Sequence, residues 1–202
     1  MKKQILKKIY FFLISVIIIF SLCVSSVSAA NVPPPTLGGI YDRGGTRISW
    51  WMSYENGGGW YEYQIINAVN NWENPGWSNP LHFVAASSNS GTMMDIYTEV
   101  ATFWPTQYRY GIYAETRFYS TNSVRMDPST NYRFTRIYLN DTTMHDLSAT
   151  NMKGTIAHEI GHTLGLNENN NNVNSIMCQS GAGRAVQTVQ QIDNSVIVSL
   201  YS

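Results

Sequence analysis

The run from Thr155 to Glu168, which reads TIAHEIGHTLGLNE, constrains this chain more than any other segment. Two histidines, His158 and His162, stand four residues apart inside an apolar pattern of helical spacing. At about 100° per residue they lie about 40° apart around a helix axis and one turn along it, so both ring nitrogens can reach a single ion. The run therefore predicts a metal-binding helix.

Glu159 follows the first histidine directly and points to the neighbouring face of the same predicted helix. From there its carboxylate is poorly placed to join the two imidazoles as a ligand, but it can stand beside a metal-bound water and accept a proton. Because the chain has only four histidines, a chance His-Glu-x-x-His run is expected roughly once in a few hundred such sequences. We therefore assign Glu159 as a candidate general base.

The residues after the second histidine predict where this helix ends. Gly165 suits a helix end that needs positive φ. If the helix continued, Glu168 would lie about 240° around the axis from His162, so it can be a ligand only if the chain turns back at the glycine. The amides of Asn167 and Asn169 are poor zinc ligands by comparison with a carboxylate.

The segment from His158 to Gly165 resembles the signature of the metzincin clan of zinc endopeptidases, His-Glu-x-x-His-x-x-Gly-x-x-His or Asp followed by a Met-turn. Its four fixed positions match one by one, and Ser175-Ile176-Met177 is similar to the Met-turn, which in that clan places the methionine beneath the metal. The departure is Glu168, where matrixins carry His and snapalysin-like enzymes carry Asp.

The resemblance implies that zinc is held by His158, His162 and Glu168, with Glu159 as the catalytic base. It also implies an α+β fold with a mixed twisted sheet, a long N-terminal helix, an active-site helix, a Met-turn and a C-terminal helix. The expected substrate is a protein or peptide. The loop from Gln179 to Arg184 is expected to line part of the pocket that selects the side chain after the scissile bond.

An alternative third ligand remains open. A thermolysin-like site needs a glutamate on a second helix, and after Glu159 the only acidic residues are Glu168 and Asp193. Asp193 lies in a C-terminal amphipathic stretch, where a solvated charge on a helix face is the ordinary interpretation. It is therefore the weaker candidate.

Four further residues outside the motif have polar side chains that can bind ions. His82 and His145 are interpreted as strand-end or loop histidines. Asp141 and Asp146 are candidates for a structural calcium site, although no dense acidic loop surrounds them.

Residues 1–30 have the pattern of a secretory signal peptide. A basic start precedes an apolar run from Tyr10 to Leu22 and the small residues Val27-Ser28-Ala29-Ala30. The apolar run is short for a membrane span. We therefore expect cleavage after Ala29 or Ala30, a secreted extracellular protein, and no stable membrane association afterwards.

The remaining residues 31–202 suit one domain with a substantial core. Loss of the four lysines in the signal leaves 9 basic against 13 acidic residues, a net charge of −4. No basic cluster survives, so nucleic acid is not an expected partner. Cys178 is the only cysteine left, which excludes an internal disulfide, and the protein is expected to be a monomer.

Residues 31–45 predict an extended, Pro- and Gly-rich lead-in, too short for a folded inhibitory pro-domain, and residues 46–202 a single catalytic domain. A helix with one buried face is predicted over Trp60 to Trp72. The metal helix is expected to begin near Thr150 or Asn151, and a C-terminal helical pattern runs from Val186 to Leu200. Runs typical of strands cover residues 47–51, 82–85, 93–100, 110–119 and 132–139.

The residues leave three functions open. The first is the zinc endopeptidase, the second a zinc hydrolase acting on cell-wall peptides or amides, and the third a secreted binding protein on a metzincin scaffold that holds metal without cleaving anything. Comparing the chain with its Glu159→Gln variant, each with measured zinc content, separates the first from the third.

Overall fold

A five-stranded mixed sheet forms the base of the fold, in the order β2 (His82–Ala85), β1 (Arg47–Met52), β3 (Met94–Glu99), β5 (Phe134–Asn140) and β4 (Ala114–Tyr119). The first four strands are parallel, and β4 pairs antiparallel with β5 at one edge. The computed structural model describes residues 32–202, so the predicted signal peptide lies outside the described residues. No helix in the described part is long and apolar enough to cross a membrane.

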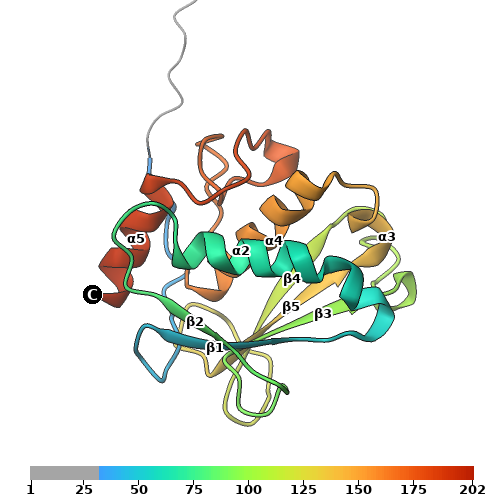
Figure 1. Ribbon diagram of the computed structural model, residues 1–202, viewed down its shortest axis with the longest axis horizontal. Helices are drawn as coiled ribbons and strands as arrows, with labels where there is room; N and C mark the ends of the chain where they lie inside the picture. Colours follow the sequence, from blue (N-terminus) through green and yellow to red (C-terminus); the bar gives the residue numbers. More distant parts are fainter. Residues whose placement is uncertain (1–31) are drawn as a thin grey trace, which may run out of the picture. The chain divides into compact units, whose positions relative to one another are not determined.

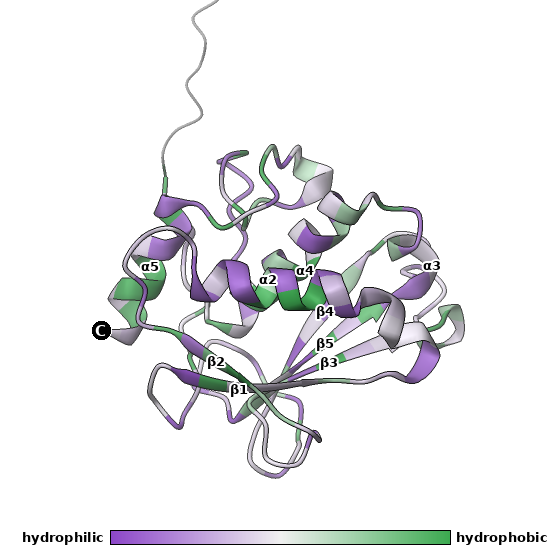
Figure 2. Cartoon of the chain, viewed as in Figure 1, coloured by the Kyte–Doolittle hydropathy of each residue, from purple (hydrophilic) through white to green (hydrophobic). Residues whose placement is uncertain are grey.

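Two helices cover one face of this sheet, α2 (Glu62–Glu73) and α4 (Ala149–Thr163) (Figure 1). The buried side of α2 carries Ile65, Ala68, Val69 and Trp72, whereas Ile66, part of the apolar spacing that predicted this helix, is 39% exposed. Figure 2 shows hydrophobic and hydrophilic segments alternating along α2, as expected for a helix with one buried side. The Trp72 indole nitrogen donates to the Ala157 carbonyl at 2.7 Å, which ties α2 to α4 beside the metal motif.

The helix with the histidine motif begins slightly earlier than predicted. Its N-cap is Ser148, whose hydroxyl accepts from the Asn151 backbone N–H at 3.2 Å, so Thr150 and Asn151 lie inside the first turn. The apolar positions Met152 and Ile156 are buried, as the four-residue spacing predicts. This buried stripe holds the helix against the sheet and α2, and leaves its other side for the motif.

The C-terminal helix α5 (Gln191–Tyr201) begins later than the pattern from Val186 predicts. A capping box between Gln190 and Asp193 starts the helix, because each residue satisfies a backbone N–H at its N-terminus. Upstream, the Val189 N–H is bound by the Asn71 side chain of α2 at 2.7 Å. This preceding segment is therefore held by tertiary hydrogen bonds and not by a helix.

The lead-in, described from residue 32 onward, is packed onto the domain. Thr36 forms an antiparallel bridge with Leu166, supported by the hydrogen bond from the Leu37 N–H to the Gly165 carbonyl at 2.8 Å. Tyr41 is only 1% exposed and belongs to the core. The lead-in therefore supports the loop that follows α4.

Candidate metal centre

The two motif histidines point their Nε2 atoms at each other from consecutive turns of α4, 3.1 Å apart. The other ring nitrogen of each contacts a backbone carbonyl, His158 Nδ1 that of Ile176 and His162 Nδ1 that of Leu166, both at 2.9 Å. Because a carbonyl only accepts, each Nδ1 carries the proton and each Nε2 presents a lone pair. Two lone pairs this close favour a cation between them.

Gly165 ends the helix and turns the chain back, as predicted. Its φ is +94°, and the Leu166 N–H and its own N–H bond the carbonyls of Gly161 and His162 at 3.1 and 3.0 Å, the two bonds of a Schellman motif. A Cβ at this glycine would lie 2.8 Å from the Gly39 carbonyl oxygen. Glu168 is thereby brought back over the two imidazoles.

The Glu168 carboxylate completes a three-residue cluster with the two imidazoles. Its Oε1 lies 3.4 Å from His162 Nε2, and its Oε2 lies 3.5 Å from His158 Nε2. Zinc ligands at 2.0–2.1 Å in tetrahedral geometry are about 3.3 Å apart, so these separations suit ligands of one ion better than hydrogen bonds. Glu168 Oε2 is buried without a hydrogen-bond partner among the described residues, and no other such His, Cys, Asp or Glu group occurs within residues 32–202.

The charges in this cluster also suit a cation. Burial would raise the pKa of Glu168, but the imidazoles of His158 and His162, when protonated, lower it to about 2, so the carboxylate is ionised at neutral pH. Burial would likewise lower the pKa of His162, but Glu168 and Glu159 outweigh it and raise that pKa. The donor set of two imidazoles and one carboxylate is a set that zinc accepts.

Glu159 does not join this cluster. Its carboxylate is buried beside α4 and accepts a hydrogen bond from the Thr116 hydroxyl of β4 at 2.6 Å. The same hydroxyl lies 3.1 Å from the Glu159 carbonyl. Thr116 holds this carboxylate in place, and the sequence did not single it out because nothing local links residue 116 to residue 159.

Met177 lies under the metal helix, fully buried, where the Met-turn was predicted. Gly161 makes this approach possible, because a Cβ there would lie 2.3 Å from Met177 Sδ and 3.0 Å from Trp72 Cζ2. The mid-helix glycine is thus required by packing.

Replacing Gly161 with Ala is expected to lower the free energy of unfolding by about 1–3 kcal/mol, because the added methyl group overpacks this contact. Chemical denaturation followed by tryptophan fluorescence measures the change. Gly181→Ala is the matched control, since no atom lies within 4 Å of a Cβ there. Equal stability of the two variants would contradict the packing role.

Asp193 is fully buried, so its interpretation as a solvated helix-face charge is wrong. It accepts hydrogen bonds from the Ser175 hydroxyl at 2.5 Å and from the backbone N–H groups of Ile176 and Gln190 at 3.0 and 2.9 Å. These bonds connect the Met-turn to the start of α5. Burial raises the pKa of Asp193 in spite of them.

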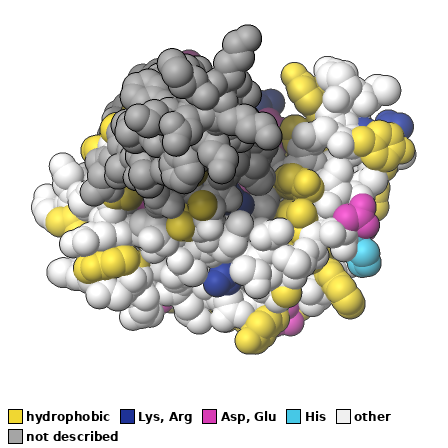
Figure 3. Space-filling model, turned by 90° about the horizontal axis from the view of Figure 1, so that it is seen from above, with side chains coloured by type: hydrophobic (Ala, Val, Ile, Leu, Met, Phe, Trp, Pro, Cys, Tyr) yellow, Lys and Arg dark blue, Asp and Glu magenta, His cyan; other side chains and the backbone are white. Residues whose placement is uncertain are grey.

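A cleft of about 990 Å³ opens over the three-residue cluster of His158, His162 and Glu168. The edge strand β4 lines one wall, and Gln179 to Gly181 with Arg184 line another, as predicted for the loop after Met177. Cys178 in this loop is buried, and burial raises its thiol pKa. Charged side chains are few and scattered on the face of the molecule in Figure 3.

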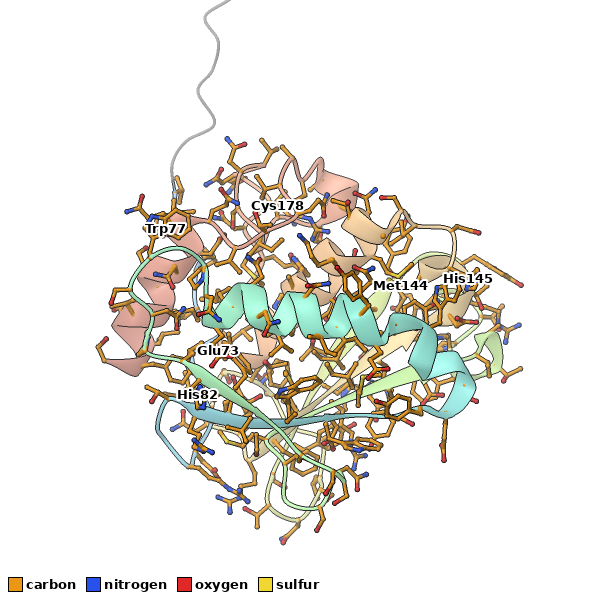
Figure 4. The ribbon with its side chains drawn as sticks, viewed as in Figure 1. Glu73, Trp77, His82, Met144, His145 and Cys178 are labelled. Carbon is orange, nitrogen blue, oxygen red and sulfur yellow. The ribbon has the colours of Figure 1, made fainter. Side chains whose placement is uncertain are left out.

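The other residues that the sequence suggested as ion ligands do not belong to this cluster. His82 contacts Glu73 near the end of α2, whereas His145 lies beside Met144 at the opposite end (Figure 4) and stacks on Trp60. The Asp141 carboxylate accepts from the Tyr61 hydroxyl at 2.7 Å. Asp146 lines the cleft without joining the cluster, and the calcium site stays a prediction.

In a comparison with known families, the family model described as matrixin matches residues 59–202 of this chain. The matched segment begins just before α2 and includes β2 to β5, α4, the Met-turn and α5, and so contains the whole three-residue cluster, whereas β1 precedes it. No curated protein matches the chain.

Proposed function

This chain belongs to the matrixin family of metalloproteases, and from that membership we propose that it is a secreted zinc endopeptidase whose metal is held by His158, His162 and Glu168. The observation that carries the proposal is the separation of the two imidazole Nε2 atoms, 3.1 Å, and of each from one oxygen of the Glu168 carboxylate, 3.4 and 3.5 Å, with each imidazole fixed through its Nδ1 atom. Glu in place of the third histidine keeps a ligand that zinc accepts.

Zinc bound at this site supplies a Lewis acid that polarises the scissile carbonyl and acidifies the attacking water. Glu159 accepts the proton of that water and passes it to the leaving nitrogen of the cleaved peptide bond. Thr116 keeps the Glu159 carboxylate oriented for both transfers. The outer edge of β4 is paired at its end, where Phe118 and Tyr119 meet residues 125–126, and the rest of this edge offers backbone groups with which an extended substrate pairs along the cleft.

Thr116→Val is expected to lower kcat about tenfold or more with little change in KM, because the variant keeps the shape and removes the hydroxyl that orients Glu159. Steady-state kinetics with one peptide substrate separates kcat from KM. Thr116→Ser is the matched control that keeps the hydroxyl. A fall in kcat of the same size in both variants would contradict the role of this hydrogen bond.

The test of the proposed function is cleavage of unfolded protein and a mixed peptide library by the purified chain. Peptide products are identified by mass spectrometry before chelation, after chelation, and after zinc is restored. The proposal predicts cleavage that stops on chelation and returns with zinc. Cleavage confined to cell-wall peptides or amides would favour the alternative hydrolase. Stoichiometric zinc without cleavage of any substrate would favour a non-catalytic binding protein.

Export of the protein rests on the signal-like pattern of residues 1–30. N-terminal sequencing of protein collected from the culture medium is expected to begin at Ala30 or Asn31. Extracellular protein that still begins at Met1 would contradict the proposal. Absence of the protein from the medium would contradict it too. A monomer is expected in light-scattering measurements of the same material.

A further inference from the structure

Arg184 is a buried cation in the wall of the cleft, 9% exposed. Its hydrogen bonds are long: Nη1 lies 3.4 Å from the Cys178 carbonyl, and Nη2 lies 3.4 Å from the Thr155 hydroxyl and 3.3 Å from Gln187 Oε1. Its Nε is buried and has no hydrogen-bond partner among the described residues. Charge-assisted hydrogen bonds are usually about 2.7–2.9 Å long, so this guanidinium is incompletely satisfied.

No carboxylate in the described part of the chain forms an ion pair with Arg184 within 4 Å. The carboxylates of Glu159 and Glu168 act on the Arg184 charge only through space. One of them is bound by Thr116, and the other faces the imidazoles. Buried charges in proteins are normally paired. An arginine kept unpaired in a cleft is therefore available to an anion that enters it.

The guanidinium of Arg184, which has no ion-pair partner among the described residues, lies close to the proposed reaction site. Thr155, which its Nη2 contacts, stands three residues before His158 on α4, about one helical turn away, and both residues line the cleft. A substrate whose scissile bond lies over the metal cluster places the side chains next to that bond within reach of this wall. The guanidinium suits a carboxylate, because its planar N–H groups match the two oxygens.

We propose that Arg184 binds a substrate carboxylate, so that the protein cleaves beside an Asp or Glu residue. This inference rests on the proposed endopeptidase function. The C-terminal carboxylate of a peptide has the same chemistry as an Asp or Glu side chain. An endopeptidase cleaves within a chain, away from its C-terminus, so the side-chain carboxylate is the one we assign. The cleft then prefers acidic polypeptides, because the buried guanidinium of Arg184 binds one of their carboxylates.

The experiment compares cleavage of matched peptides in which each position flanking the scissile bond is Glu, Gln, Asp, Asn or Leu. Every peptide is made both as the C-terminal amide and as the free acid. We expect kcat/KM for Glu to exceed that for Gln about tenfold or more at one flanking position, equally in both C-terminal forms. Cleavage that requires the free acid near the scissile bond would overturn the side-chain assignment in favour of C-terminal recognition.

The variant Arg184→Leu is expected to reduce the Glu to Gln ratio to about one while zinc content and thermal stability are kept. Arg43→Leu is the matched control, since Arg43 contacts the Gly91 carbonyl and does not line the cleft. A zinc-dependent wild-type profile without acidic preference, or an unchanged profile in Arg184→Leu, overturns the inference and leaves the proposed function standing.

A binding measurement covers the case in which no peptide is cleaved, which would itself overturn the proposed function. Fluorescent Glu and Gln peptides are titrated into the zinc-loaded protein and its Arg184→Leu variant. A Glu preference of about tenfold that Arg184→Leu removes supports the carboxylate site without catalysis. Equal binding of the two peptides to the wild-type protein overturns it.

Discussion

Glu159→Gln is expected to lower kcat/KM about 10²–10⁴-fold, the usual contribution of a general acid or base, while zinc stays bound at one ion per chain. Glutamine has the shape of glutamate but accepts no proton from the attacking water. The zinc content is preserved because Glu159 lies outside the ligand cluster, bound instead by the Thr116 hydroxyl. Peptide cleavage rates and elemental analysis of the same sample measure both quantities.

Glu115→Gln provides the control for this experiment. Glu115 lines the same cleft, but its carboxylate pairs with Arg117 and Arg125. Its substitution is expected to leave kcat/KM within a few fold of the wild type. Loss of zinc from Glu159→Gln would place this residue in the ligand set, and an unchanged rate would remove it from the chemistry.

Glu168→Ala is expected to weaken zinc binding by about two to three orders of magnitude, with activity lost at limiting zinc. Four-ligand zinc sites bind with about 10–16 kcal/mol, so one ligand contributes roughly 3–4 kcal/mol. Competition with a chromophoric chelator measures the zinc Kd directly. No other described carboxylate joins the histidine pair, so substitution here leaves two protein ligands.

Asp146→Ala is the matched control for the third ligand, because Asp146 is an acidic residue of the same cleft outside the cluster. Its zinc Kd is expected to equal that of the wild type. A wild-type zinc Kd in Glu168→Ala would remove Glu168 from the ligands. Asp193 is a poor substitute in that case, since its carboxylate is already bound by Ser175 and two backbone N–H groups.

The helix with the metal motif could be predicted from the sequence because its determinants are local. The four-residue histidine spacing and the buried stripe follow from helix geometry alone. The helix end at Gly165 was predicted for the same reason, since a glycine with φ of +94° is a local requirement. The return of Glu168 toward His162 then followed, although the distance between the two side chains required the folded chain.

The residues that sequence reasoning missed act through tertiary contacts. Thr116 reaches Glu159 from a strand 43 residues away, and Asp193 reaches Ser175 across 18 residues. No sequence motif around Thr116 or Asp193 indicates these contacts. Arg184 was expected in the cleft wall, but its unpaired, buried state depends on where neighbouring carboxylates lie, which local patterns do not fix.

The late start of α5 has a similar cause. Apolar spacing from Val186 onward is compatible with a helix, but the capping box of Gln190 and Asp193 and the bond from Val189 to Asn71 hold the preceding residues in another conformation. The sheet, by contrast, follows the predicted runs of apolar and aromatic residues, except that β4 begins at Ala114 and residues 110–113 of the run over 110–119 lie in a turn. The strand over His82–Ala85 has the predicted bounds.

X-ray absorption at the zinc edge of the purified, zinc-loaded protein tests the central claim most directly. The account predicts one zinc per chain with two imidazoles and otherwise oxygen ligands, at about 2.0–2.2 Å, and loss of one oxygen ligand in Glu168→Ala. Three imidazoles, or a sulfur at about 2.3 Å contributed by Cys178, would contradict the ligand set of His158, His162 and Glu168. Failure to retain any zinc would contradict the metal centre itself.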